Sequence, residues 1–165
     1  MCTYCGCHSI DSVGSLAEEH DASLGLLAHA RRAVYRGDAD EAVRLATELI
    51  KVIGPHTAVE EHVVFPVLVA DYPEYVASLL DEHRRIDASL YDAATMTGQA
   101  ALAALADAAE TLRQHIRREE DGLYPAALSS LELEDWERAE RVRHSVLARP
   151  RALAAARTFS GRSAI

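Results

Sequence analysis

Two His-x-x-x-Glu segments, His56 with Glu60 and His115 with Glu119, constrain the fold of this 165-residue chain more than any other feature. On a helix, residues four positions apart lie on one face, one turn apart. Each segment can therefore direct an imidazole nitrogen and a carboxylate oxygen at one point beside the helix. This ligand set suits iron, manganese or zinc, and the absence of thiolate argues against an iron–sulfur cluster. The spacing predicts metal ligands carried on helices.

The two segments belong to a longer internal repeat. Each is followed directly by a second glutamate and then, at identical offsets, by an aromatic residue and a proline, Phe65-Pro66 and Tyr124-Pro125. Upstream, Glu19-His20 matches Glu82-His83. The chain thus reads as two helical hairpins related by pseudo-two-fold symmetry, each offering His and then His-x-x-x-Glu. Two equal halves facing each other predict two metals that share a central site.

Helical periodicity continues through most of the chain and is interrupted by short polar or proline-containing joints. Abundant Ala and Leu with only 5% aromatic residues favour helices over sheets. We expect Pro55 and Pro66 to bend or locally end the second helix. The expected helices cover about residues 13–36, 40–70, 73–96, 99–128 and, more briefly, 134–147. We therefore predict an all-α fold, an up-and-down antiparallel four-helix bundle with a short additional C-terminal helix.

Each of the four long helices carries an apolar stripe for the interior, and a histidine lies at or beside every stripe. In the first helix the predicted interior positions are Val13, Leu16, His20, Leu24, Leu27 and Val34.

A buried imidazole or carboxylate without a partner costs several kcal/mol, so the histidines and glutamates at these interior positions need a common explanation. The predicted metal ligands are His20, His56, Glu60, His83, His115 and Glu119. Two octahedral irons offer about twelve positions, and these ligands with a bridging oxide or hydroxide leave about one open position per metal.

Composition excludes several classes of protein. The formal net charge is −9, with 26 acidic residues against 17 basic ones, the opposite of the balance in a nucleic-acid binder. No uninterrupted apolar run approaches about 18 residues, so we expect no membrane span. The first nine residues contain neither a basic start nor an apolar run, so we expect no secretory signal and a cytoplasmic protein.

The two ends of the chain differ from the middle. All three cysteines, Cys2, Cys5 and Cys7, lie near the start, and such an odd, crowded set forms no disulfide framework. They suit either a flexible reduced segment or a redox or metal-binding role, including thiols that fold back over the metal site. We predict three parts: a Cys-containing segment at 1–12, the bundle with its short C-terminal helix at 13–148, and a basic, flexible tail at 149–165. The tail is either solvated or a docking segment for an acidic partner.

With these motifs the chain resembles the hemerythrin-like, or HHE cation-binding, family. That family carries His, His-x-x-x-Glu, His and His-x-x-x-Glu on four successive helices. The residues that carry the resemblance are 18–21, 56–66, 81–84 and 115–125, and the resemblance covers about residues 13–128. The start Met-Cys-Thr-Tyr-Cys-Gly-Cys and the region of Trp136 are similar to actinobacterial members.

The resemblance implies two non-haem iron ions with an oxo or hydroxo bridge. It places His20 and His56 on one iron and His83 and His115 on the other, with bridging carboxylates from Glu60 and Glu119. The oxygen-carrying members have a further histidine four positions after the one in the third helix, where this chain has Asp87. Three roles are open for Asp87, namely a seventh ligand, an acceptor of a hydrogen bond from a ligand histidine, or a solvated charge, and we favour the acceptor. This departure disfavours plain reversible oxygen carriage.

Three functions remain open at this point. The first is a protein that binds or senses oxygen or related small oxidants. The second is a di-iron enzyme that removes peroxide or nitric oxide. The third is a metal-sensing helical module that acts through protein partners. No separate catalytic acid or base is evident, and ligand sets alone rarely separate such functions. We expect a small-molecule partner such as dioxygen, peroxide or nitric oxide, and the sequence leaves the oligomeric state open.

Overall fold

The computed structural model describes residues 11–160, and these residues form helices with no strand among them. Cys2, Cys5 and Cys7 lie outside the described residues. The elements follow in the order α1 (Asp11–Arg36), α2 (Ala39–Val59), η2 (Glu60–Val64), α3 (Phe65–Leu68), α4 (Pro73–Thr95), α5 (Gly98–Arg118), η3 (Glu119–Leu123), α6 (Tyr124–Ser130) and α7 (Leu133–Ser160). The segments η2 and η3 are π-helical, and each continues the helix before it.

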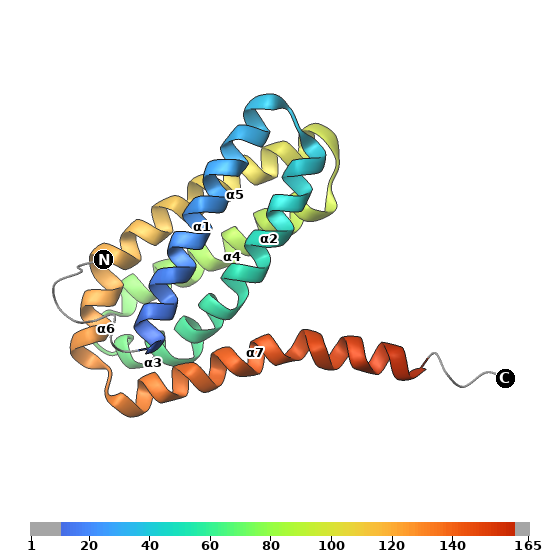
Figure 1. Ribbon diagram of the computed structural model, residues 1–165. Helices are drawn as coiled ribbons and strands as arrows, with labels where there is room; N and C mark the ends of the chain where they lie inside the picture. Colours follow the sequence, from blue (N-terminus) through green and yellow to red (C-terminus); the bar gives the residue numbers. More distant parts are fainter. Residues whose placement is uncertain (1–10, 161–165) are drawn as a thin grey trace.

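Helices α1, α2, α4 and α5 form an antiparallel bundle in which each packs against its neighbours, α1 on α2 and α5, and α4 on α2 and α5 (Figure 1). The tight joint between α1 and α2 shows why the chain reverses there. Gly37 has a φ of +68°, a left-handed conformation that glycine adopts without strain at a helix end. The Asp38 carboxylate then caps α2 by accepting from the Glu41 N–H at 3.1 Å. The predicted all-α bundle is confirmed.

The prolines of the repeat explain the π-helical segments. Proline has no N–H and clashes with the carbonyl four residues before it, so an α-helix cannot run through it unchanged. Widening the preceding turn relieves this clash, and the Phe65 and Tyr124 N–H groups bond to carbonyls five residues back, those of Glu60 and Glu119. The local interruption predicted at Pro66 is confirmed. Pro55, in contrast, lies inside α2 without ending it.

The interior has three layers along the bundle. An apolar cluster at one end includes Leu27, Leu49, Ile86, Leu90, Leu105 and Leu112. A second cluster at the other end includes Leu16, Val63, Phe65, Leu79, Leu123 and Trp136. The buried histidines and glutamates lie between these clusters. The interior position predicted for Leu24 is wrong, because Leu24 is 37% exposed while Ser23 and Leu27 face the interior.

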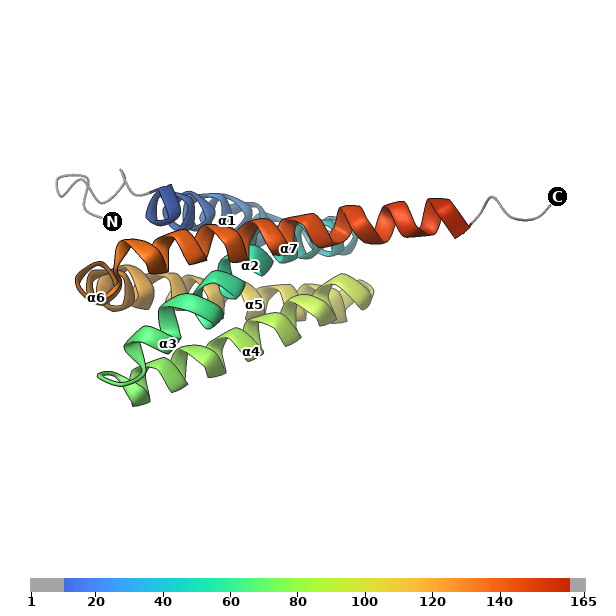
Figure 2. The same cartoon turned by 90° about the horizontal axis from the view of Figure 1, so that it is seen from below.

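Helix α7 lies outside the four-helix bundle. It begins at the end where α3 and α6 lie, packs against α1, α2 and η2, and extends past the bundle (Figure 2). Trp136 and Ala139 join the second apolar cluster and attach α7 to the bundle. The helix starts within a residue of its predicted start and runs to Ser160, beyond the predicted end near residue 147. No helix in the described part of the chain has the length and apolarity to cross a membrane.

Candidate metal centre

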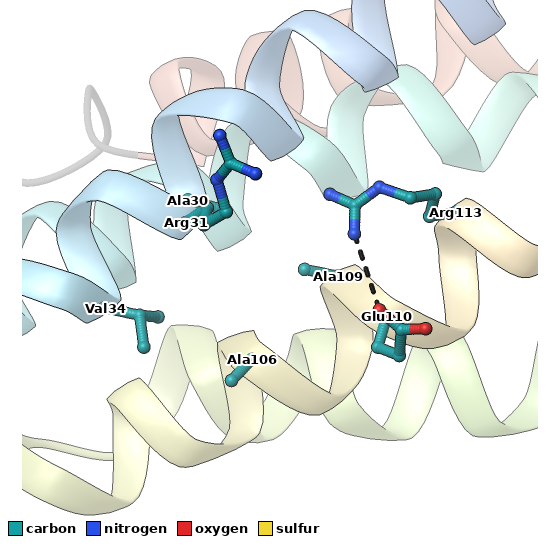
Figure 3. Close-up of a pocket in the computed structure, with 7 residues that line it drawn as sticks. All are labelled: Ala30, Arg31, Val34, Ala106, Ala109, Glu110 and Arg113. Atoms are coloured by element: carbon teal, nitrogen blue, oxygen red, sulfur yellow. Dashed lines mark hydrogen bonds and ion pairs between the residues drawn. The ribbon is translucent and has the colours of Figure 1, made fainter.

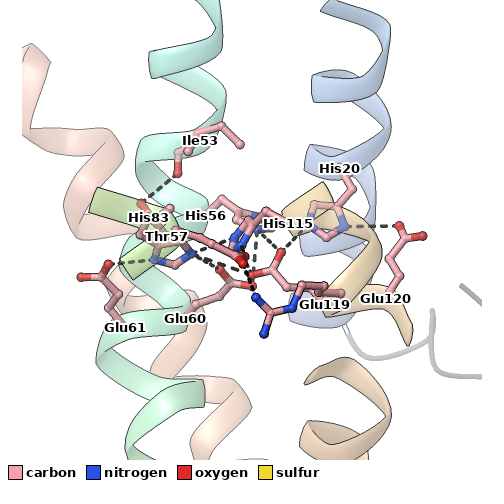
Figure 4. Close-up of polar contacts among 12 residues, drawn as sticks. His20, Ile53, His56, Thr57, Glu60, Glu61, His83, His115, Glu119 and Glu120 are labelled. Atoms are coloured by element: carbon pink, nitrogen blue, oxygen red, sulfur yellow. Dashed lines mark hydrogen bonds and ion pairs between the residues drawn. The ribbon is translucent and has the colours of Figure 1, made fainter. Parts of the chain in front are cut away.

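The structure brings together all six side chains that the sequence predicts as ligands (Figure 4). None is more than 2% exposed. They come from α1, α2, η2, α4, α5 and η3 and form two overlapping groups whose nitrogen and oxygen atoms lie within 4.8 Å of one another. One group is Glu60, His83, His115 and Glu119, and the other is His20, His56 and Glu119.

Each central glutamate spans the two halves of the repeat. Glu60 places Oε1 3.4 Å from His56 Nε2 and Oε2 3.3 Å from His83 Nε2. Glu119 places Oε1 2.8 Å from His115 Nε2 and Oε2 3.1 Å from His20 Nε2. The two carboxylates therefore each direct one oxygen at each half, in the arrangement expected of a bridging carboxylate.

A second set of glutamates orients the four imidazoles from outside. Each Nδ1 atom faces a carboxylate from the neighbouring helix, at 2.8–3.3 Å. The pairs are His20 with Glu120, His56 with Glu19, His83 with Glu61, and His115 with Glu82. These pairs join α1 to α2, η2 to α4, α4 to α5, and η3 back to α1, so they close a ring around the bundle.

The ring determines which imidazole nitrogen faces the interior. A carboxylate at Nδ1 holds the proton on that nitrogen, so the Nε2 lone pair of each histidine is directed at the centre. Two of these atoms, His83 Nε2 and His115 Nε2, are only 3.0 Å apart, and two lone pairs at that distance repel unless positive charge lies beside them. Among the described residues, Glu60 Oε2 and Glu119 Oε1 are buried and accept no hydrogen bond. A cation satisfies all four atoms, so the donor set fits a metal.

When no cation is bound, protons supply the positive charge. Burial opposes protonation of His83, but the carboxylates of Glu119 and Glu60 beside its ring raise its pKa to about 10. Burial also opposes protonation of His56 and His115, and the charges of Glu60 and Glu119 nonetheless raise both pKa values. Burial and the charge of Glu119 raise the pKa of Glu60, but His56 and His83 lower it to about 2. The cluster therefore needs cationic charge, which a metal ion supplies when bound and which protons on His56, His83 and His115 supply when it is not.

The sequence model of the hemerythrin HHE cation binding domain matches residues 11–127, about seven-tenths of the chain. The chain belongs to the hemerythrin HHE cation-binding family. Searches among curated proteins and among solved structures found no significant match. Membership assigns a cation-binding function to this helical domain, and the buried His and Glu cluster fits a metal site.

One hydroxyl breaks the symmetry of this hemerythrin-like centre. In a π turn, residues five positions apart lie on the same face of the helix. Phe65 and Tyr124 lie five positions after Glu60 and Glu119, so they reach the cluster. Phe65 stacks on His83 with ring centroids 5.4 Å apart. The Tyr124 hydroxyl donates to Glu60 at 3.0 Å and lies 3.3 Å from His20 Nε2. Burial, Glu60 and Glu119 raise the Tyr124 pKa, so this hydroxyl stays protonated as a donor.

Asp87 does not have the role expected for it. It lies on an exposed face of α4 and makes no hydrogen bond to a ligand histidine among residues 11–160. Glu61 occupies the place at His83 Nδ1 instead, at 2.8 Å. The α-helical spacing of four favoured Asp87, but the neighbouring helix brings Glu61 closer. The remaining described histidines, His29, His62 and His144, are exposed and belong to no part of the centre.

A cavity elsewhere in the hemerythrin-like bundle is separate from the centre. It measures about 180 Å³ and lies between α1 and α5, where small side chains leave space between the helices (Figure 3). Its lining is Ala30, Arg31, Val34, Ala106, Ala109, Glu110 and Arg113. None of the six predicted ligands borders it.

Sequence reasoning missed four residues behind the ligands. Glu19 and Glu82 precede the first histidine of each half, and their repetition was a signal that had no assigned role. Arg118 and Arg143 form ion pairs with Glu82 and Glu19, respectively. No repeat marks the two arginines, because they come from helices that are not equivalent.

Proposed function

We propose that the chain holds two iron ions and uses them to bind or sense oxygen or related small oxidants. The observation that carries this proposal is that Glu60 and Glu119 each direct one oxygen at each half. We assign His20 and His56 to one iron and His83 and His115 to the other, with both glutamates bridging. Imidazole and carboxylate ligands suit iron among the metals available to proteins.

The charge around the site supports two cations. Six carboxylates and two guanidinium groups lie at or directly behind the imidazoles: Glu19, Glu60, Glu61, Glu82, Glu119, Glu120, Arg118 and Arg143. Their formal charge sums to −4 and two divalent cations neutralise it. One divalent ion leaves half of that charge uncompensated around Glu60 and Glu119, which are fully buried and where uncompensated charge is costly.

The surroundings of the site support a small, uncharged reactant. The six side chains are at most 2% exposed and lie between two apolar clusters, so the bundle excludes large substrates. Iron supplies the capacity to bind oxygen and exchange electrons with it. The chain itself orients the imidazoles through their Nδ1 atoms and provides one buried donor, the Tyr124 hydroxyl.

Removal of peroxide or nitric oxide is the second candidate. Tyr124 favours it, because a hydroxyl donor beside His20 and a Phe65 ring beside His83 make the two halves unequal. A hydrogen-bond donor on one side stabilises charge that develops on one atom of a bound peroxide or nitric oxide and not on the other.

Metal analysis combined with anaerobic absorption spectroscopy tests the proposal. We expect two irons per chain and a visible band that appears when the reduced protein meets air and disappears when oxygen is removed. An irreversible change with rapid loss of added peroxide or nitric oxide would favour the enzyme instead. Iron that alters compactness without any oxygen response would favour a metal-sensing module, and protein that takes up no transition metal would refute a metal centre altogether.

A further inference from the structure

Helix α7 sends one charged side chain into the bundle. Arg143 is 6% exposed, and its guanidinium forms an ion pair with Oε1 of Glu19 in α1. The other oxygen of that carboxylate, Oε2, lies 3.2 Å from Nδ1 of His56. A continuous chain of contacts therefore runs from α7 through Glu19 to His56.

The second half of the repeat contains the same chain of contacts, atom for atom. Arg118 forms an ion pair with Oε1 of Glu82, and Oε2 of Glu82 lies 2.9 Å from Nδ1 of His115. Arg118 comes from α5 itself, three residues after His115. The equivalent position, three residues after His56, is Val59. Helix α7 thus supplies the guanidinium that the first half of the repeat lacks.

Burial of Arg143 is poorly explained by stability alone. Its Nε and Nη2 atoms make no hydrogen bond among the described residues, and the nearest further carboxylate, Glu140, is 3.8 Å away. A buried guanidinium with unpaired donors costs free energy, and apolar residues of similar volume often stabilise a fold equally well. Trp136 and Ala139 already attach α7 to the apolar cluster. The side chain is better explained by what it does to Glu19.

We propose that Arg143 is a positioning residue that orients His56, a ligand of the metal centre, through Glu19. As a consequence, the docking of α7 and the binding of metal at His20 and His56 depend on each other. The inference rests on the proposed metal site. A guanidinium on Oε1 restricts rotation of the Glu19 carboxylate and keeps Oε2 on the imidazole. Because coupling of two equilibria is reciprocal, metal in this position must also hold α7 in place.

The test uses the full chain loaded with Co²⁺, whose paramagnetism shifts the exchangeable Nδ1–H resonances of ligand imidazoles away from other NMR signals. We expect Arg143→Met to broaden the His56 resonance by solvent exchange and to weaken one of the two Co²⁺ sites by about 10- to 100-fold. Arg143→Lys, which can still pair with Glu19, should restore most of the affinity. His56→Ala removes a ligand of the first position, so the signals that it shifts or abolishes are those of His20 and His56, and Arg143→Met should broaden one signal of that pair.

Two matched variants separate positioning from general damage. Arg118→Met should broaden the His115 resonance and spare that of His56. Arg138→Met removes a guanidinium from α7 that pairs with Asp135 and is 46% exposed, so it should change neither resonance. Far-UV circular dichroism and Trp136 fluorescence report whether α7 stays folded and docked in each variant.

Hydrogen exchange supplies the reciprocal measurement, and its wild-type part does not depend on any variant folding. Co²⁺ should slow amide exchange in α7 of the wild-type chain, and this effect should be absent in Arg143→Met. Unchanged α7 exchange on metal binding, or a Met variant with both affinities and all four resonances intact, would overturn the inference. A wild-type chain that binds no Co²⁺ would instead refute the proposed metal site.

Discussion

Raising the pH of the metal-free protein from 6.5 to about 8.5 is expected to destabilise it, since the raised pKa values of His56, His83 and His115 favour their cationic forms in the folded state. The pKa of His83 is about 10 in the fold and 6.5 in its absence. A group whose pKa is raised by folding stabilises the fold fully below its unfolded pKa, and the contribution disappears as the pH rises through the folded pKa. The sensitive range is therefore about pH 6.5 to 10.

The magnitude follows from the proton-binding equilibria of the two states. Between pH 6.5 and about 8.5, the shift of His83 alone removes about 2 kcal/mol from the free energy of unfolding. His56 and His115 are shifted in the same direction and steepen the fall. Bound metal replaces these protons at Nε2, so the loaded protein should lack the slope, and metal should bind more tightly as the pH rises.

Urea unfolding at a series of pH values, with chelator or with saturating metal, measures both slopes. The matched variants are His83→Gln, which should flatten the slope of the chelated protein, and His144→Gln, whose side chain is 79% exposed and should leave the slope unchanged. A chelated protein that is equally stable or more stable at about pH 8.5 would show that the imidazoles are neutral without metal, and the electrostatic account of the cluster would fail.

Three further changes test separate parts of the structure. Glu119→Ala should lower the iron content because it removes a carboxylate that faces both halves, whereas His29→Ala should not; equal iron in both variants would contradict the ligand assignment. Tyr124→Phe should keep two irons per chain but bring their two ⁵⁷Fe Mössbauer doublets closer, and unchanged doublets would show that the hydroxyl does not distinguish the two positions. Leu105→Ala should lower the free energy of unfolding by about 2–5 kcal/mol without altering iron content, because Leu105 lies in the apolar cluster beyond the polar layer; a loss of iron would show that the two layers are coupled.

The residues at the centre of the bundle were accessible from sequence because their spacing is local. A separation of four between His56 and Glu60 places both on one face of any helix, and the repetition at His115 and Glu119 makes chance improbable. The π turns were partly accessible as well, since Pro66 cannot continue an α-helix unchanged. Leu24 shows the limit of helical spacing as a guide to burial, because a residue at the edge of the apolar stripe is exposed or buried according to the angle of the neighbouring helix.

The partners of the imidazoles were inaccessible for a different reason. Asp87 has the right spacing from His83 on its own helix, yet Glu61 of another element takes that place. Glu19 likewise bonds to His56 on the next helix rather than to the adjacent His20. Neighbouring residues on a helix point about 100° apart, so the contact of each glutamate depends on which helix lies beside it.

By itself, the sequence determined the helices, their order, the family and the six side chains that meet inside, because helical spacing and an internal repeat are properties of the chain alone. Tertiary structure decided how these side chains are held. The ring of four outer glutamates, the lone hydroxyl of Tyr124 and the arrival of Arg143 from α7 all depend on packing between distant segments. Such contacts have no period in the sequence, so only the folded arrangement of the helices reveals them.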